Sequence, residues 1–366
     1  MPLPLILGAA ALVSAAYGAK KGYDGYQKHS EADEIVNGAK ARYEKQKTTF
    51  DKQETATTSA LNILGEKELQ IGKTFGDFTT LAEKLLEQLN AGRQNKLEIN
   101  IPKHKLQTIA NYSYTAIGVL GSAAGAGAAG AAAGFAVYGG VMALGAASTG
   151  TAISSLAGVA ATNATLAAIG GGSLATGGLG MAGGTAILGA AVAGPVLAIA
   201  GWAYDSHGEE ALKNARKVDR EVDQAIDKLV KAVKQLDETE NYAHSIWTTL
   251  IALFDQFNQY YDALKGINSV LEDAKSRNAD GKAELARFSD SIMQTVGNGF
   301  ALASIMVSVI TTPIFKVKKA NGEVVKDADG VPVMETDAVG SMILNSSKLD
   351  EVLSQADAEA GKYKPA

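Results

Sequence analysis

The chain has no cysteine, and it is poor in proline and in aromatic residues. None of its 366 residues is cysteine, seven are proline, and 6% are aromatic. The absence of cysteine excludes disulfides and thiol chemistry, and it leaves the redox compartment open. Because prolines are few, long helices meet few breaks. The composition therefore favours a small number of large helical units.

Charge is missing from one long stretch, 106–204, which we call the central block. Leu106 to Tyr204 contains no Asp, Glu, Lys or Arg, whereas Lys105 precedes it and Asp205 follows it. An uncharged apolar run of about 18 residues or more is a candidate membrane span, and this block has room for several. It is built from Ala and Gly rather than from Leu, Ile and Phe.

Small residues recur at i, i+4 inside the central block. This spacing lets two helix backbones approach closely, and van der Waals packing then holds them together in lipid. At the end of the block an amphipathic ring next to Asp205 favours a membrane interface. The residues predicted to act in insertion and helix packing are Gly121, Gly125, Gly130, Gly134, Gly180, Gly184, Trp202 and Tyr204.

A buried helical hairpin in a soluble bundle is the alternative for the central block. Ala is the best helix former, and a helix that is apolar all round can lie inside a bundle. Each interior Gly, however, destabilises a soluble helix by about 0.5–1 kcal/mol relative to Ala. Ala and Gly also insert only weakly into lipid. We therefore expect a block that is packed in water in one state and enters lipid in another.

Two heptad patterns flank the central block and predict one long helix on each side. They cover Ser30–Leu89 and His207–Leu271. The first helix would be on the order of 90 Å long at about 1.5 Å per residue. Helices of matched length are expected to pack antiparallel and to carry the block at their tip. Gly65, Gly72 and Gly76 weaken the first pattern and are expected to bend it.

The N-terminal run Pro2 to Ala19 is uncharged, and Lys20 and Lys21 follow it. It predicts a hydrophobic anchor, or a helix packed on the central block, with the lysines on the cytoplasmic side. A cleaved signal peptide is the competing interpretation, although the positively charged start is missing.

The C-terminal part combines helices with a hairpin. Ser291 to Phe315 is uncharged, and we favour a buried bundle helix over a span because Thr311–Thr–Pro313 ends it. Asn321–Gly322 suits the type I′ turn of a β-hairpin. Asp337 to Ala360 is predicted as a last short helix.

The predicted fold class is all-α. It is an elongated bundle of two long antiparallel helices plus shorter helices, with a long hydrophobic Gly/Ala-rich helical insert and a small C-terminal β-hairpin. The predicted segments are 1–29 (anchor), 30–105 (long helix and linker), 106–204 (membrane-interacting block), 205–313 (second long helix and bundle helix) and 314–366 (hairpin and C-terminal helix).

No catalytic constellation emerges from the sequence. The four histidines lie far apart, and none has a second His or a carboxylate at metal-ligand spacing. Gly72–Lys73–Thr74 resembles the end of a phosphate-binding loop, but the required Gly spacing and the preceding strand are missing. The net charge of −5 speaks against a general nucleic-acid binder. We therefore predict no enzyme activity, no cofactor and no metal.

The layout of two long helices around an uncharged block resembles the α-helical pore-forming toxins of the cytolysin A and haemolysin BL type. That resemblance implies a tongue, 106–204, that is packed away in the soluble form and extends on contact with a membrane. Ser148–Gly180 also looks like the Gly/Ala segment of small interferon-inducible membrane proteins. Bacterial glycine-zipper membrane proteins are a further comparison. These resemblances rest on architecture, and no functional residue carries over from them.

The expected function is membrane insertion, of pore-forming or membrane-disrupting type, with self-assembly through Gly faces. The expected partners are a lipid membrane and further copies of the chain. The alternative is a constitutive membrane-anchored coiled-coil scaffold that binds partner coiled-coil proteins. The expected location is a membrane, either the bacterial inner membrane or a target membrane reached by secretion.

Overall fold

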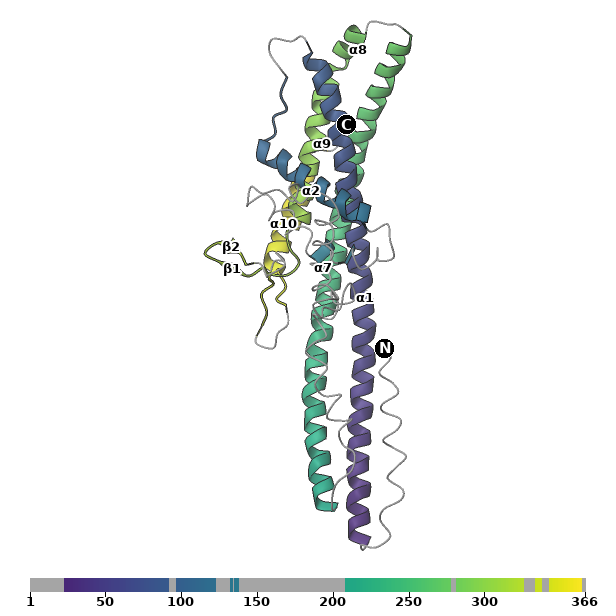
Figure 1. Cartoon of the computed structure of the whole chain (residues 1–366), viewed down its shortest axis with the longest axis vertical. Helices are drawn as coiled ribbons and strands as arrows, with labels where there is room; N and C mark the ends of the chain where they lie inside the picture. The colour runs from purple at the N-terminus through teal and green to yellow at the C-terminus, as the bar shows by residue number, and fades with distance from the viewer. Residues whose placement is uncertain are drawn as a thin grey trace. The chain divides into compact units, whose positions relative to one another are not determined.

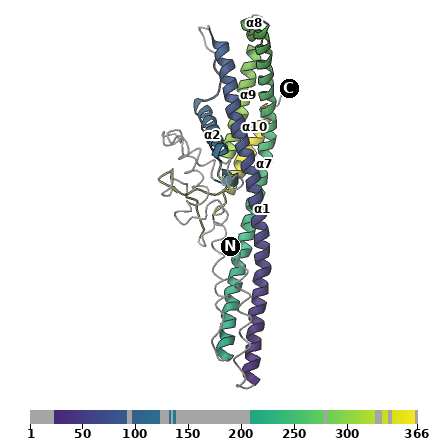
Figure 2. The same ribbon diagram turned by 45° about the vertical axis from the view of Figure 1, so that its right-hand side comes forward.

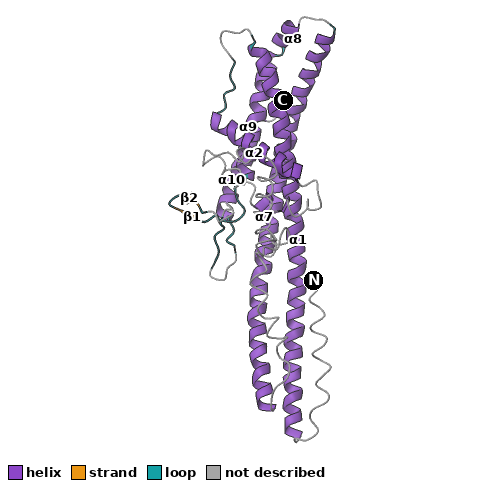
Figure 3. Cartoon of the chain, viewed as in Figure 1, coloured by secondary structure: helices purple, strands orange, loops and turns teal. Residues whose placement is uncertain are grey.

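The computed structural model describes residues 23–91, 97–122, 132–133, 135–137, 208–277, 281–325, 333–337 and 342–363. In these residues the chain is almost entirely helical (Figure 3). The helices are α1 (Tyr23–Asn90), α2 (Lys103–Ser122), α7 (Gly208–Ser276), α8 (Gly281–Arg287), α9 (Ser289–Ile310) and α10 (Ser346–Ala360), followed by a 3-10 turn at Gly361–Tyr363. Two short strands, β1 (Lys319–Ala320) and β2 (Glu323–Val324), form an antiparallel pair. The all-α class with a small hairpin is thus confirmed.

The chain divides into two compact units, and both long helices contribute to each. In the described residues, unit 1 holds α1 up to Thr57 and α7 up to Glu238. Unit 2 holds the remainder of α1 and α7 together with α2, α8, α9, α10 and the hairpin. The expected N-terminal anchor lies mostly outside the described residues, because α1 begins at Tyr23.

In unit 1, α1 and α7 pack along an apolar seam of heptad type. Small residues meet at its beginning, and larger ones follow. Its polar position Thr57 is buried, and its hydroxyl donates a hydrogen bond of 3.0 Å to the Leu236 carbonyl. The seam consists of Ala32, Val36, Ala39, Tyr43 and Phe50 on α1, and of Ala211, Ala215, Val218, Val222, Ala225, Leu229 and Leu236 on α7.

The two long helices run parallel, so the expected antiparallel pair is wrong. In unit 1, Arg42 bonds to Asp219 at 2.6 Å, and later in both helices Thr57 bonds to Leu236. In unit 2 the partners again advance together, because Phe75 and then Lys84 on α1 contact Phe257 and then Glu272 on α7. Figures 1 and 2 show the colour of both ribbons advancing in the same direction. The expectation failed because it rested on the matched lengths of the helices, whereas the chain between α1 and α7 is long enough to return.

The core of unit 2 is a group of aromatic rings on α1, α7 and α9. The Phe78 ring lies edge-on to Phe257, Tyr261 and Phe300, with centroids 5.0, 5.9 and 5.1 Å away. Gly299 on α9 leaves the space that the Phe78 ring occupies, since a Cβ there would overlap it. α9 is therefore a buried bundle helix in the part of the chain that the structure describes, in line with our preferred interpretation of Ser291 to Phe315.

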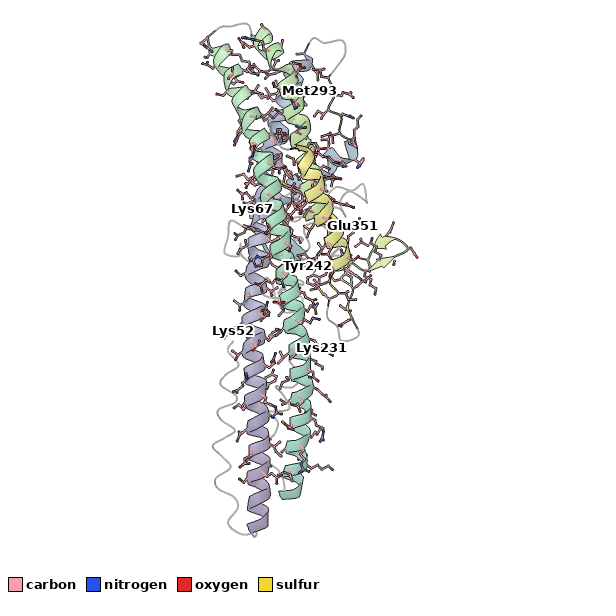
Figure 4. All side chains as sticks on the ribbon, turned by 180° about the vertical axis from the view of Figure 1, so that it is seen from behind. Lys52, Lys67, Lys231, Tyr242, Met293 and Glu351 are labelled. Atoms are coloured by element: carbon pink, nitrogen blue, oxygen red, sulfur yellow. The ribbon has the colours of Figure 1, made fainter. Side chains whose placement is uncertain are left out.

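The hairpin and α10 complete unit 2. Asn321 and Gly322 both have positive φ, 52° and 85°, as a type I′ turn requires. The last helix begins at Ser346 rather than at Asp337, because the residues just before it pair as β-bridges: Met342 with Thr336 and Leu344 with Phe315. α10 then packs on α9, and the Tyr242 hydroxyl of α7 donates a hydrogen bond of 3.1 Å to an Asp350 carboxylate oxygen of α10 (Figure 4).

Cysteine cross-linking tests the parallel direction. Because the chain has no native cysteine, Arg42→Cys with Asp219→Cys gives one defined pair, and we expect a short bismaleimide to join it within one molecule. The matched control is Arg42→Cys with Glu238→Cys, whose second thiol lies about 28 Å further along α7 and should not react across the pair. Electrophoresis after cross-linking reads the result. Cross-linking of the control pair but not of the first would contradict the parallel arrangement.

Substitution of Phe78 tests the aromatic core. Phe78→Ala removes a ring that is 1% exposed, and we expect it to lower the free energy of unfolding by about 3–5 kcal/mol. Ile63→Ala is the control on the same helix, because Ile63 is 49% exposed and its loss should change that free energy by about 0.5 kcal/mol or less. Urea titration measures both. Equal effects of the two substitutions would show that Phe78 does not anchor the core.

Candidate functional site: the seam between α1 and α2

The structure describes the first part of the central block. α2 includes the beginning of the block, and residues 132–133 and 135–137 are also described. Of the predicted insertion and packing residues, Gly121 alone falls in the described part, near the end of α2. A Cβ at Gly121 would meet nothing within 4 Å. The other seven, Gly125, Gly130, Gly134, Gly180, Gly184, Trp202 and Tyr204, lie outside the described residues, so their roles stay predictions.

α2 packs antiparallel on α1 over two glycines, and a third glycine of α1 contacts residue 132 of the block. A Cβ on Gly72 would collide with the Ala116 Cβ, and one on Gly76 would lie 2.7 Å from the Ser113 Oγ. Further back on α1, a Cβ on Gly65 would overlap the Ala132 backbone. Because these glycines have no side chain, the block can approach the α1 backbone closely. We call this contact the glycine seam: Gly65, Gly72 and Gly76 of α1 against Tyr112, Ser113, Ala116 and Ala132.

The glycine seam gives these three glycines a role that the sequence interpretation missed. We expected them to bend the helix; in the structure they lie in the contact with the block, within a helix that runs without a break from Tyr23 to Asn90. A small residue at each of these positions permits close approach of a second helix backbone, which is the contact we had predicted for glycines inside the block. The signal was present in the sequence, since the three glycines recur at seven and four residues along one helical face.

Tyr112 is the largest side chain in the seam, and it is fully buried. Its hydroxyl donates a 2.7 Å hydrogen bond to the backbone carbonyl of Glu68. Its ring lies 6.3 Å from the Phe75 ring on α1 and 6.0 Å from the Phe135 ring of the block. Tyr112 therefore joins both described parts of the block to α1.

Glu68 is an ionisable side chain inside this apolar contact. It is 2% exposed, and its Oε2 has no hydrogen-bond partner in the part of the chain that the structure describes. Burial raises the pKa of the Glu68 carboxyl well above its ordinary value. Burial, and then the nearby Glu68 charge, raise the pKa of the Tyr112 phenol. The sequence signal was a carboxylate between the buried residues Leu64 and Ile71, at a position where the heptad pattern of α1 requires an apolar residue.

α2 also carries three large apolar side chains that are partly exposed, although the Ile117 Cδ1 lies 3.1 Å from a Cβ position on Gly76 of α1. Tyr114, Ile117 and Leu120 follow one another at three-residue spacing and are 51%, 47% and 38% exposed. Gly118, between them, has nothing within 4 Å of a Cβ position. Exposed large apolar side chains that cluster on one face are typical of a surface that meets a partner or a membrane.

α9 is a second apolar feature. It has the length and composition of a membrane-spanning helix, with a mean hydropathy of 1.4, but 61% of that window is buried. A core helix of a soluble protein passes the same test, and Gly299 of α9 packs against Phe78 in the core of unit 2.

The described residues form a hollow large enough for a small ligand. A hollow of about 520 Å³ lies between the residues before α2 and helix α9, with Glu98, Lys105, Asn298 and Glu359 in its wall. In the described ranges, no group of three or more His, Asp or Glu side chains is placed to hold a metal ion.

The comparisons with known proteins found nothing: no protein-family model, no curated protein and no solved structure matches the chain.

Two Gly→Ala substitutions test the seam. Gly72→Ala places a methyl group against Ala116, and we expect overpacking to lower the free energy of unfolding by about 1–3 kcal/mol. Gly118→Ala is the matched control on α2: its methyl group enters open space, so helix propensity should raise that free energy by about 0.5–1 kcal/mol. Urea titration of both variants checks the opposite signs. If Gly72→Ala stabilised the protein as Gly118→Ala does, the close contact would be refuted.

Proposed function

We propose that the chain is a membrane-inserting helical protein of pore-forming or membrane-disrupting type. The soluble form holds the central block against the long helices. On a membrane the block leaves α1, enters lipid and assembles with further copies. The observation that carries this proposal is the uncharged block 106–204, whose beginning, α2, rests on α1 across glycines and carries exposed apolar side chains.

The glycine seam supports a reversible contact. Gly65, Gly72 and Gly76 have no side chain to interlock with the block, so the contact of α2 with α1 consists of backbone proximity, Tyr112 and small side chains. α2 also packs on α9. Small residues also suit helix packing in lipid, where close approach of backbones holds helices together. The same chemistry therefore serves the packed form and an assembled membrane form.

The exposed apolar side chains of α2 support lipid contact. Tyr114, Ile117 and Leu120 are already partly exposed, and α2 leads directly into the remaining uncharged residues of the block. A helix with such side chains can bind at a lipid surface by burying them. First contact with a membrane then needs no unfolding of α1 or α7.

A disulfide lock tests this function. In the seam, the Ser113 Oγ lies 2.7 Å from a Cβ position on Gly76, which is close to the geometry of a disulfide. We expect the wild-type chain to release dye from lipid vesicles. Oxidised Gly76→Cys/Ser113→Cys should release it at least about tenfold more slowly, since α2 is tied to α1, and dithiothreitol should restore release.

The single variants Gly76→Cys and Ser113→Cys are the controls for effects of each substitution alone. Two results would refute the proposal: no dye release by the wild-type chain at any lipid composition or pH, or release by the oxidised double variant at the wild-type rate. A chain that leaves the membrane fraction of expressing cells only with detergent would favour the alternative, a constitutive membrane-anchored scaffold.

A further inference from the structure

Glu68 is the most unusual ionisable group in the described part of the chain. It lies on the face of α1 that carries Gly65 and Gly72, between the contacts with Ala132 and with Tyr112. Its side chain is 2% exposed and its Oε2 is unpaired among the described residues. A buried carboxylate without a partner is strongly disfavoured, so burial favours the protonated carboxyl.

The neighbouring groups do not compensate a charge on Glu68. On α2, Tyr112 uses its hydroxyl as a donor to the Glu68 backbone carbonyl. On α1, the Lys67 ammonium lies 5.4 Å from the centroid of the Phe254 ring and donates to Gln70 (Figure 4). The described residues 132–137 carry no charge. Further charged side chains on these helices are exposed to solvent: Glu66, Lys73 and Asp77 on α1, Lys103, His104 and Lys105 on α2, and His244 and Asp255 on α7.

We propose that Glu68 is a proton-dependent latch for α2: the neutral carboxyl allows α2 to stay docked on α1, and loss of the proton releases α2. The latch controls the release of α2 from α1, which is a step of the proposed function, so the inference rests on that function. The docking equilibrium itself needs no membrane.

The direction of the pH effect follows from the raised pKa of Glu68 in the docked form. When α2 leaves, Glu68 meets water and returns to an ordinary carboxyl pKa. The docked form therefore binds the proton more tightly. Docking is most favourable at pH values below the ordinary carboxyl pKa, and it weakens as pH rises towards the docked-form pKa. Between these two values the ratio of released to docked α2 rises by about tenfold per pH unit.

Spin-label distances test the latch without lipid. Thr80→Cys on α1 and Ala110→Cys on α2 are both exposed and uncharged positions, and the chain has no other cysteine. With nitroxides on both, we expect the distance distribution to shift to longer distances as pH rises from about 5 to about 9, the range above an ordinary carboxyl pKa. In the Glu68→Gln background the distribution should remain at the short, docked distance throughout.

Glu66→Gln in the labelled chain is the matched control, because Glu66 is exposed two residues away, and it should keep the wild-type response. A pH-independent distance in the wild-type chain would overturn the latch, and so would a Glu68→Gln variant with an unchanged pH response. Should Glu68→Gln fail to fold, Glu68→Leu provides the same loss of charge, with the same expected outcome.

Failure of the latch and failure of the function are distinguishable. A labelled chain that opens with pH while the wild-type chain never permeabilises vesicles supports the latch and refutes membrane disruption. If the wild-type chain and its Glu68→Gln variant permeabilise vesicles at equal rates at every pH, the function is retained and the latch is refuted.

Discussion

The parallel direction of α1 and α7 is the constraint on which the rest of the molecule depends. In a parallel pair, the C-terminal end of the first helix and the N-terminal end of the second lie at opposite ends of the pair, so the connection between them cannot be a tight turn. The central block is part of that connection. The uncharged residues of the block therefore also belong to the segment that connects Asn90, at the end of α1, to Gly208, at the beginning of α7. α2, antiparallel to α1, is the beginning of this return.

The contact of α2 with α1 combines two opposing features. Glycines in the seam bring backbones together and increase dispersion contacts, which are individually small but numerous. Glu68 places a carboxyl in the same contact, where its charged form is costly. A pure stability criterion would replace Glu68 by an apolar residue. Its presence makes the strength of docking depend on solution conditions, whereas the core around Phe78 is built from aromatic rings and does not share this dependence.

Much of the fold was predictable because local patterns are strong here. The heptad registers placed the end of α1 and the beginning of α7 to within one residue, whereas α1 begins seven residues earlier and α7 ends five residues later than predicted. Asn321–Gly322 specified the hairpin through backbone conformations that few other residues adopt. The direction of α7 relative to α1 was not predictable from the same patterns, since a heptad seam packs in either direction. Connection length decides between the two, and we had weighed helix lengths instead.

The candidate site was predictable only in part. The absence of charge drew attention to the central block, and α2 belongs to it. The partner surface on α1 was missed, because glycines inside a heptad pattern were interpreted as weak points rather than as space for another helix. Glu68 was missed because its heptad position counts as a polar interruption until the neighbouring backbone is known. Both lessons concern one helix face, 65–76, on which small residues and a single buried acid occur together.

The parallel pair also limits how the chain can be shortened. If the residues between Asn90 and Gly208 were replaced by a brief linker, the linker could not reach from the end of α1 back to the beginning of α7. The parallel pairing of the two heptad surfaces would then be possible only between separate molecules, and the product of that pairing would be an exchanged dimer. The uncharged residues are thus also the spacer that keeps this pairing within one chain.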